Sequence, residues 1–351
     1  MRAVLAFPGD IDTPTGGYAY DRAVLAAMTD QGVDMTALSL PAAFPAPTSA
    51  DVAKAAAQLA AVPPDSLLLI DGLALGAFPA AALRALARPV VALVHHPLAR
   101  EAGLSDADRT RLDVNERAVL ALCAGVIATS AATGRDLVAH FAVPPDRLTI
   151  AEPGCAPAPR VTADGDPPHL LAVGSVIPRK NYLGLVEALA TVADLPWRAT
   201  FIGALTFAPD TVGAVRAAIA AHGLNGRIAL AGAVTPEALA EAYAACDLFV
   251  HPSLYEGYGM VLADALRRGL PLICTTGGAA ADTVSDGAAI KVPPGDTPAL
   301  ADALRTLIST PERRRHLGDA AYAAGQRLPT WDQTAAHIAA ALAAAATRGQ
   351  A

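Results

Sequence analysis

Long hydrophobic runs are missing from this sequence of 351 residues. No stretch approaches the roughly 18 uninterrupted apolar residues that a transmembrane helix needs. The apolar residues 3–7 are too few for the core of a signal peptide, and Pro8-Gly9 follows them at once. We therefore expect a cytoplasmic protein; the sequence leaves peripheral contact with a membrane and the oligomeric state open.

Positive charge and cysteine are scarce as well. The chain has 26 lysines and arginines against 33 acidic residues, a net charge of −7, and an acidic chain is poorly suited to binding a nucleic-acid backbone. We therefore expect no nucleic-acid partner. The cysteines lie too far apart for a metal clip or a redox pair, so we expect buried, reduced thiols. They are Cys123, Cys155, Cys246 and Cys274.

Apolar residues dominate what the sequence does contain. They make up 53% of the chain against 17% charged residues, which is enough for a sizeable core. Short apolar runs alternate with helical segments over residues 3–129 and again over 169–309. This alternation predicts the α/β class, with parallel sheets covered by helices on both faces. In such sheets, ligands bind at the carboxyl ends of the strands.

A proline-rich segment separates the two alternating regions. We place a linker at residues 156–168, between domains at residues 1–155 and 169–330. A helix predicted at residues 331–347 follows the second sheet, and we expect it to pack back on the first domain. Two similar α/β domains joined in this way predict a cleft between them.

Two adjacent cations follow the first strand of the second domain. Arg179 and Lys180 lie in the loop 174–181, between a predicted strand and a predicted helix. Fixed cations at the carboxyl edge of a sheet suit a diphosphate, whose oxygens need charge-assisted hydrogen bonds. The alternative is an ordinary pair of solvated loop residues.

A glycine-rich loop with an acidic residue follows a later strand. It runs from His251 to Met260 and leads into a predicted helix that contains Asp264. Glycine lets the backbone approach a ligand closely, and the free N–H groups of a helix start suit phosphate or sugar oxygens. Glu256 and Asp264 flank the helix start, so each can hold hydroxyls of one elongated ligand. Asp264 alone is equally explained as a first-turn acid that the helix dipole favours.

These motifs together resemble the retaining glycosyltransferases of the GT-B fold, family 4. The resemblance implies two Rossmann-like domains with parallel sheets facing across a cleft, and it spans nearly the whole chain. It is carried by Arg-Lys-Asn at 179–181, by Pro-Ser-x-x-Glu-Gly-x-Gly at 252–259 with the acid at 264, similar to the family's Glu-x7-Glu motif, and in the first domain by Thr15-Gly16-Gly17, His95 and Ala128-Thr-Ser130.

The resemblance also implies roles for individual residues. Arg179 and Lys180 match the family's diphosphate cations, and Glu256 matches the carboxylate that touches the transferred sugar. Asp264 stands where the family has a glutamate that grips the nucleotide ribose, and His95 matches a histidine near the sugar. The implied catalytic residues are Glu256, Lys180, Arg179 and His95. The implied donor-binding residues are Gly16, Gly17, Arg179, Lys180, Gly257, Tyr258, Gly259, Met260, Val261 and Asp264.

Three positions depart from the family pattern. Gly174-Ser175 stands where relatives often have Gly-Arg, which leaves Arg179 to do that arginine's work alone. Asp264 is one methylene shorter than the usual glutamate. His96 occupies a position that is often acidic in relatives, so the sequence leaves open whether His95 or His96 faces the sugar.

Two further patterns bear on cofactors. Asp10-Ile-Asp12 has the Asp-x-Asp form of the metal site in the other glycosyltransferase fold, but it stands in the loop before Gly16 and not after a mid-domain strand. We therefore expect no metal and no cofactor. The G-x-G-x-x-G fingerprint is absent after the first strand, which argues against a nicotinamide dehydrogenase.

The resemblance implies a metal-independent reaction with retention of configuration. A sugar passes from a UDP- or GDP-sugar to an acceptor hydroxyl, and the departing diphosphate helps deprotonate the acceptor by front-face attack. Two alternatives remain: a catalytically silent relative that binds nucleotide sugar, and a sugar-nucleotide epimerase or hydrolase on the same fold. The sequence does not reveal the donor sugar, or whether the acceptor is a saccharide, lipid-linked or a small molecule.

Overall fold

The computed structural model describes residues 1–101 and 103–348, and the chain divides into two compact units. Unit 1 comprises Met1–Gly154 together with the segment from Pro329 onward, and unit 2 comprises Cys155–Leu328. The segment 156–168 therefore belongs to unit 2, and residues 329–330 belong to unit 1.

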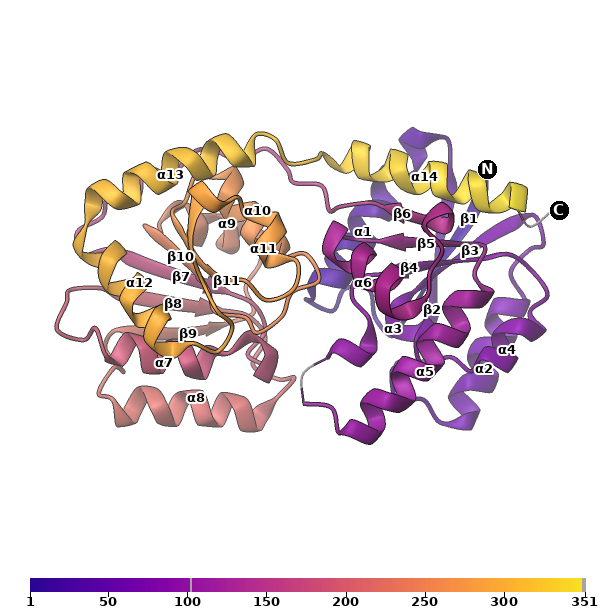
Figure 1. Ribbon diagram of the computed structural model, residues 1–351, viewed down its shortest axis with the longest axis horizontal. Coiled ribbons are helices and arrows are strands. Elements are labelled where there is room, and N and C mark those ends of the chain that lie inside the picture. The colour runs from indigo at the N-terminus through magenta and orange to yellow at the C-terminus, as the bar shows by residue number, and fades with distance from the viewer. Residues whose placement is uncertain (102, 349–351) are drawn as a thin grey trace. The chain divides into compact units, whose positions relative to one another are not determined.

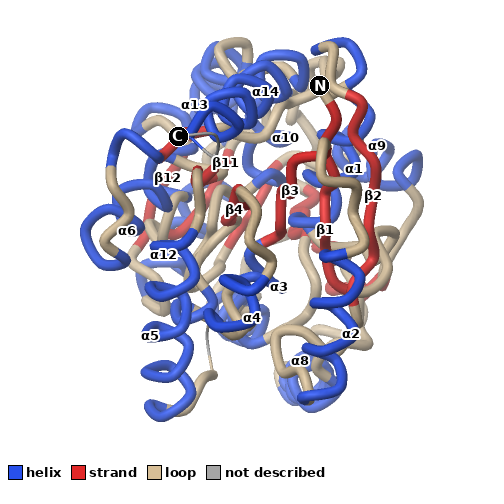
Figure 2. Tube along the Cα trace, turned by 90° about the vertical axis from the view of Figure 1, so that its right-hand side faces the viewer, coloured by secondary structure: helices blue, strands red, loops and turns tan. Residues whose placement is uncertain are grey.

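Unit 1 is built on a six-stranded parallel sheet with the strand order β2-β1-β3-β4-β5-β6 (Figure 1). The strands are β1 (Arg2–Pro8), β2 (Asp34–Leu40), β3 (Ser66–Asp71), β4 (Val90–Val94), β5 (Gly125–Ala128) and β6 (Leu148–Ile150). Figure 2 shows β1 and β2 side by side. Every residue of β4 and β5 is buried, because elements pack on both faces of the sheet.

Polar side chains begin several helices of unit 1. Thr15 accepts a hydrogen bond from the backbone N–H of Tyr18, and Ser130 accepts one from Thr133, which satisfies N–H groups that a helix leaves unpaired. The helices are α1 (Gly16–Ala27), α2 (Ser49–Ala60), α3 (Gly72–Leu75), α4 (Ala80–Ala85), α5 (Asp106–Leu122), α6 (Ala131–Phe141) and α14 (Trp331–Arg348). Helix α14 packs against α1 and β5 (Figure 1).

Unit 2 repeats this plan with the strand order β12-β11-β10-β7-β8-β9, also parallel. The strands are β7 (His169–Val173), β8 (Arg198–Ile202), β9 (Ile228–Gly232), β10 (Leu248–His251), β11 (Leu272–Thr275) and β12 (Ala289–Val292). The helices are α7 (Tyr182–Ala190), α8 (Pro209–Ala221), α9 (Pro236–Ala244), α10 (Met260–Arg267), α11 (Ala280–Thr283), α12 (Thr297–Ser309) and α13 (Pro311–Gly325).

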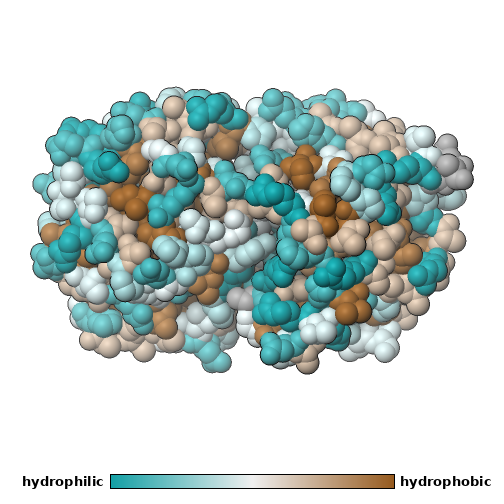
Figure 3. Space-filling model, viewed as in Figure 1, coloured by the Kyte–Doolittle hydropathy of each residue, from teal (hydrophilic) through white to brown (hydrophobic). Residues whose placement is uncertain are grey.

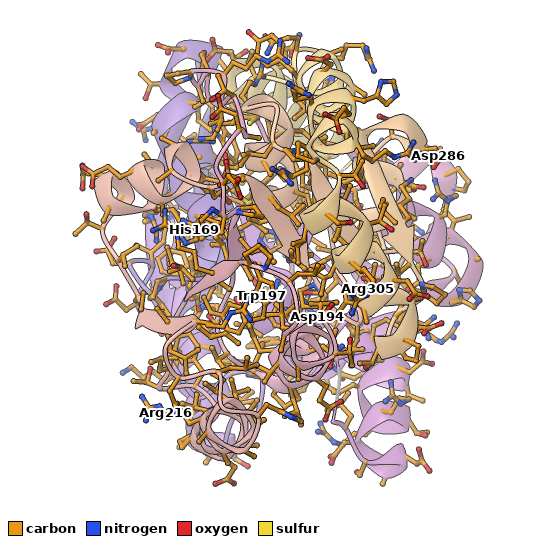
Figure 4. All side chains as sticks on the ribbon, turned by 90° about the vertical axis from the view of Figure 1, so that its left-hand side faces the viewer. His169, Asp194, Trp197, Arg216, Asp286 and Arg305 are labelled. Carbon is orange, nitrogen blue, oxygen red and sulfur yellow. The ribbon has the colours of Figure 1, made fainter. Side chains whose placement is uncertain are left out.

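Alternate residues of the unit 2 strands enter two separate apolar clusters. Leu170 lies in one cluster and its neighbour Leu171 in the other, since successive side chains of a strand point to opposite faces. On the first of these faces, Arg305 of α12 pairs with Asp194, which follows α7, with 2.8 Å between Nη1 and Oδ2 (Figure 4). The two sheets confirm the predicted α/β class.

A helix that spans a membrane needs both sufficient length and sufficient apolarity. Within residues 1–101 and 103–348, no helix is both long enough and apolar enough to cross a bilayer. Figure 3 shows hydrophilic and hydrophobic residues intermixed on the displayed face of each unit.

Candidate functional site

A buried carboxylate with three basic neighbours lies at the carboxyl edge of the unit 2 sheet. Glu256 Oε1 is 2.6 Å from Lys180 Nζ and 2.8 Å from His251 Nε2, and Glu256 Oε2 is 3.6 Å from an Nη1 of Arg179. Strands β7 and β10 are neighbours. The turn 178–180 after β7 and the loop after β10 therefore meet at one edge, as the sequence predicts for ligand-binding loops.

Electrostatics keeps Glu256 ionised despite its burial. Its side chain is only 7% exposed, and burial opposes the charged form. Lys180, His251 and Arg179 outweigh that effect and hold the pKa of Glu256 well below its ordinary value. Burial in turn lowers the pKa of His251, so the neutral ring donates from Nε2 to the carboxylate. This hydrogen bond gives His251 a role that the sequence analysis does not assign.

The loop that carries Glu256 is held by backbone contacts to two other loops. An Nη1 of Arg179 donates to the carbonyl of Tyr255 at 2.7 Å. The N–H of Glu256 donates to the carbonyl of Gly277 at 3.2 Å, and its carbonyl accepts from Ala279 at 2.8 Å. Arg179 thus supports the loop as well as facing its carboxylate.

Gly277 and Gly278 permit this close approach. A Cβ atom at Gly277 would lie 2.2 Å from the carbonyl oxygen of Leu254, and one at Gly278 would lie 2.3 Å from that of Glu256. Gly278 also has φ +63°, a conformation that favours glycine. The sequence analysis does not single out these residues; the signal for them is the Gly-Gly pair one residue after the end of strand β11.

The remaining donor-binding candidates of unit 2 line the entry to α10. Gly259 has φ +90° and immediately precedes the helix, which begins at Met260. Tyr258 is buried against Cys155 and Ala263, whereas Gly257, Met260 and Val261 are partly exposed. The first turn of α10 thus begins directly after the loop that carries Glu256, and a helix start leaves N–H groups without a partner within the helix.

Asp264 stands apart from the Glu256 cluster in its contacts. Its Oδ1 lies 3.6 Å from an Nη1 of Arg268 and 3.9 Å from the Cys155 sulfur. The side chain is 40% exposed. Burial raises the pKa of Asp264, and Arg268 opposes that rise.

A second cluster lies at the carboxyl edge of the unit 1 sheet. His95 follows β4, Asp71 ends β3, and Asp21 lies on α1. His95 Nε2 is 3.3 Å from Asp21 Oδ1 and 3.3 Å from Asp71 Oδ2. A Cβ atom on Gly17 would lie 3.4 Å from the His95 ring, whereas one on Gly16 would meet open space. Gly17 thus lets the start of α1 approach His95.

The two carboxylates of this cluster differ in their protonation. Burial opposes the charge on His95, but Asp21 and Asp71 outweigh it and raise the pKa of His95 to about 10. Burial and the neighbouring Asp71 raise the pKa of Asp21 to about 7, while contacts with His95 keep the pKa of Asp71 below its ordinary value. Among the described residues, Asp21 Oδ2 is buried without a hydrogen-bond partner.

The same three residues have the geometry to hold a cation. One ligand atom from each of Asp21, Asp71 and His95 lies within 4.8 Å of the others. A metal would have to displace the proton on His95. The raised pKa of His95 makes its protonated form, the imidazolium, the favoured one at neutral pH. Asp10, by contrast, accepts a hydrogen bond from the N–H of Asp12 in a local turn.

The two consecutive histidines point to different partners. His95 lies against Gly17 and the two aspartates, whereas His96 Nε2 lies 3.1 Å from Glu101 Oε2. The sequence analysis finds His95 and Gly17 but not Asp21 or Asp71. Those two acids are 50 positions apart (71 − 21) and come together only through the fold.

Family models match most of the chain. The model described as "Glycosyl transferases group 1" matches residues 158–324, and that described as "Glycosyltransferase Family 4" matches residues 23–158. The D-inositol 3-phosphate glycosyltransferase of Nocardia farcinica is 29% identical over 274 residues, covering 70% of this chain and 59% of that protein. The MMP alpha-(1->4)-mannosyltransferase of Mycolicibacterium hassiacum is 26% identical, covering 71% and 63%. The chain thus spans less than two thirds of the length of these relatives.

Solved structures share the fold over nearly the whole chain. Sucrose-phosphate synthase from Thermosynechococcus elongatus has a TM-score of 0.80 at 21% identity, covering 96% of this chain and 97% of that one. Anabaena HepE in complex with UDP and glucose has a TM-score of 0.76 at 18% identity, covering 97% and 99%. At these identities the likeness shows the fold alone, and it is the two-domain, Rossmann-like GT-B fold that the sequence predicts.

Proposed function

Since this chain belongs to the glycosyl transferases group 1 family, we propose that it moves a sugar from a nucleotide diphosphate donor to an acceptor hydroxyl with retention of configuration. One observation carries the proposal: the buried Glu256 carboxylate meets Lys180, Arg179 and His251 at the ligand-binding edge of unit 2. A charged acceptor for sugar hydroxyls and two cations for phosphate are thereby placed side by side.

The donor diphosphate binds beside Lys180 and Arg179, at the start of α10. The free N–H groups of a helix start and two adjacent cations are the usual partners of phosphate oxygens. Solved complexes of HepE contain UDP and UDP-glucose, which supports a UDP-sugar as the first donor to test, with a GDP-sugar as the alternative. Asp264 holds the ribose from the exposed side of its carboxylate.

Glu256 holds the transferred sugar. Its pKa lies well below the ordinary value, so at neutral pH the group is ionised and accepts hydrogen bonds from sugar hydroxyls. His251 and Lys180 occupy one oxygen of the carboxylate from within the protein. These two contacts fix the orientation of the carboxylate before the sugar binds.

Bond exchange takes place on one face of the sugar. The bond between the anomeric carbon and the diphosphate oxygen breaks, and the acceptor oxygen bonds to that carbon from the same side. The acceptor proton passes to the departing diphosphate. Negative charge grows on the diphosphate as it leaves, and Lys180 and Arg179 stabilise it. Because these cations already offset the diphosphate charge, the transfer needs no metal.

Acceptor binding is assigned to unit 1. Its His95 and Gly17 keep the roles that the resemblance implies, toward the transferred sugar and the donor, and they lie at the carboxyl edge of its sheet, where ligands of parallel sheets bind. His95 carries a positive charge at neutral pH because Asp21 and Asp71 raise its pKa to about 10. It is therefore a hydrogen-bond donor and not a general base.

The test is donor turnover with a matched inactive variant. The protein is incubated with UDP- and GDP-sugars, with and without EDTA, and nucleotide release and the anomeric configuration of the product are followed by NMR. We expect slow hydrolysis or transfer with retention, unaffected by EDTA and lost in Glu256→Gln. Binding without nucleotide release would identify a silent relative, and conversion of the sugar nucleotide into its epimer would identify an epimerase. Activity that EDTA abolishes and manganese restores would identify a metal-dependent transferase.

A further inference from the structure

A hollow lined by three arginines lies at the opposite edge of the unit 1 sheet. Its volume is about 450 Å³, and Arg88, Arg147 and Arg348 contribute to its wall. Arg88 comes just before β4, Arg147 just before β6, and Arg348 ends α14. Since β4, β5 and β6 are adjacent and parallel, the hollow lies at their amino ends. We call these three side chains the arginine pocket.

Backbone contacts bring two of the guanidinium groups together. Arg147 donates from Nη1 to the carbonyl of Cys123 at 3.0 Å, and Arg348 donates from Nε to the carbonyl of Ala124 at 2.8 Å. These carbonyls belong to consecutive residues, so the two cations occupy neighbouring positions. An Nη2 of Arg348 also lies 3.6 Å from the position that a Cβ atom on Gly125 would take.

Arg88 is fixed from the other side of the hollow. Its Nη1 donates to the carbonyl of Val62 at 2.7 Å, and its Nη2 donates to the carbonyl of Pro63 at 2.9 Å and to that of Ser66. Burial lowers the pKa of Arg88, and Asp65 opposes that change. Asp65, however, forms its ion pair with Arg2.

The arginine pocket therefore holds positive charge that is not paired with an acid in the part of the chain that the structure describes. Within residues 1–101 and 103–348, none of its three arginines has a carboxylate within ion-pair distance, and none of the residues lining the hollow is acidic. Such a concentration is unusual in a chain with a net charge of −7. Arg147 and Arg348 each direct a single nitrogen at the backbone, and the remaining N–H groups of each fork suit an oxyanion.

We propose that the arginine pocket binds a phosphate group, carried as a monoester or diester, at a site separate from the donor and acceptor sites. His95 follows the far end of β4, and Arg88 precedes its near end. Five strand residues at about 3.3 Å each put roughly 16 Å of strand between the two edges. Guanidinium forks match phosphate oxygens in pairs. Arg147 and Arg348 offer such forks, and Arg88, whose two Nη atoms donate to backbone carbonyls, adds positive charge beside them. This proposal does not depend on glycosyl transfer.

The experiment compares two double variants. Arg147→Ala/Arg348→Ala removes two of the three arginines of the pocket and leaves Arg88, which has more backbone hydrogen bonds, in place. Arg216→Ala/Arg313→Ala removes the same charge from exposed positions of unit 2. Arg216 lies on α8 (Figure 4) and Arg313 on α13. Calorimetric titration with inorganic phosphate measures the free anion. Sedimentation with phosphatidylcholine vesicles, with and without phosphatidylglycerol, measures a phosphodiester headgroup, and thermal unfolding confirms that both variants fold.

We expect the pocket variant to lose phosphate affinity by about tenfold for each guanidinium removed, with the control variant unchanged. Loss of phosphate binding alone identifies a soluble phosphate ligand. Loss of binding to phosphatidylglycerol vesicles as well, with phosphate competing, identifies a lipid headgroup. Equal affinities in the pocket variant, the control and the parent protein, for phosphate and for vesicles, would overturn the proposal.

Discussion

Lys180 links two loops through a single side chain. Its ammonium lies 2.6 Å from Glu256, and its stem packs against Gly174 at the end of β7. The sequence predicts that this lysine faces a diphosphate, but it does not reveal that the same ammonium also neutralises the buried acid. The residue therefore has to satisfy an internal carboxylate and a ligand at once.

Replacing Lys180 with alanine tests whether its contact with the diphosphate matters for turnover. Charge on the diphosphate grows only as the glycosidic bond breaks, so the lost contact is stronger in the transition state than in the bound donor. We expect Lys180→Ala to lower kcat by on the order of 10²–10³, with a smaller change in KM. Steady-state kinetics with the active nucleotide sugar measures both.

Lys54→Ala is the control for this variant, because Lys54 is exposed on α2. Lys291 is unsuitable because it binds Asp286 and the carbonyl of Ala281. A higher KM with kcat intact would make Lys180 a uniform binder and would remove the main electrostatic element of the mechanism.

The Asp21–His95–Asp71 cluster predicts how stability changes with pH. In the folded protein the pKa of Asp21 is raised to about 7 and that of His95 to about 10. A group with a raised folded pKa binds more protons in the folded state between its two pKa values, so stability falls as pH rises through that window. We expect a decline between pH 4 and 7 from Asp21, continuing between pH 6.5 and 10 from His95.

Asp21→Asn isolates the first part of this profile. The variant cannot ionise at position 21, so its free energy of unfolding should be flatter between pH 4 and 7 than that of the parent protein. It keeps the later decline, since Asp71 still faces His95 at 3.3 Å. Urea unfolding at several pH values measures both slopes. Parallel profiles for variant and parent would mean that Asp21 ionises normally.

Sequence reasoning singles out those residues of the two clusters that belong to local motifs. Arg179, Lys180 and Glu256 follow strands and precede helices, and their meeting follows from parallel strand order. It misses Asp21 and Asp71, because each looks locally like an ordinary helix or strand-end acid. Both acids lie 3.3 Å from His95 in the folded protein, and their positions along the chain do not indicate this.

Elements are recovered unevenly for similar reasons. The buried strands of both sheets are short apolar runs, so their pattern is visible in the sequence. Helix α13 (Pro311–Gly325) is not predicted, because three arginines and a histidine follow one another near its start. Among them Arg314 is buried and donates to the carbonyls of Leu307 and Ile308, an arrangement that a polar pattern conceals.

The turn between β11 and α11 is an element whose shape depends on glycine. In Gly278→Ala, the new Cβ atom would lie 2.3 Å from the carbonyl oxygen of Glu256, at a residue with φ +63°. We expect this variant to lose about 2 kcal/mol or more of stability and to lose activity, since the Glu256 loop has to shift. Thermal unfolding and nucleotide release measure the two effects.

Gly287→Ala is the matched control, because a Cβ atom there meets nothing within 4 Å and the residue has no positive φ. We expect its melting temperature and activity to stay close to those of the parent. A Gly278→Ala variant with the same activity as Gly287→Ala would show that the Glu256 loop does not need this close approach.

At the scale of the whole molecule, each unit has its own apolar core. One large cluster joins the strands and helices of unit 1, and two large clusters and the small one around Tyr258 lie in unit 2. The cysteines are distributed between them: Cys123 belongs to unit 1, and Cys155, Cys246 and Cys274 belong to unit 2. All four are buried free thiols, and burial raises the pKa of Cys123 and of Cys274 to about 12.

The reactivity of these thiols can be used to follow the unfolding of each unit. A buried thiol with a raised pKa reacts only when its surroundings open, so modification rates report local or global unfolding of each unit. A nucleotide bound to unit 2 at 100 times its dissociation constant stabilises that unit by about 2.7 kcal/mol, which lowers its open population about 100-fold. We therefore expect saturating UDP to slow alkylation of Cys246 and Cys274 by about that factor, and to leave Cys123 unchanged.

Mass spectrometry of the alkylated peptides reads each cysteine separately within one sample, so Cys123 serves as an internal control. Protection confined to unit 2 would place the nucleotide there and would mean that the units open independently, as separate cores favour. Equal protection of Cys123 would mean that the chain unfolds as one cooperative body. Protection of Cys123 alone would place the nucleotide on unit 1, and the assignment of Lys180 and Glu256 to the donor would then be wrong.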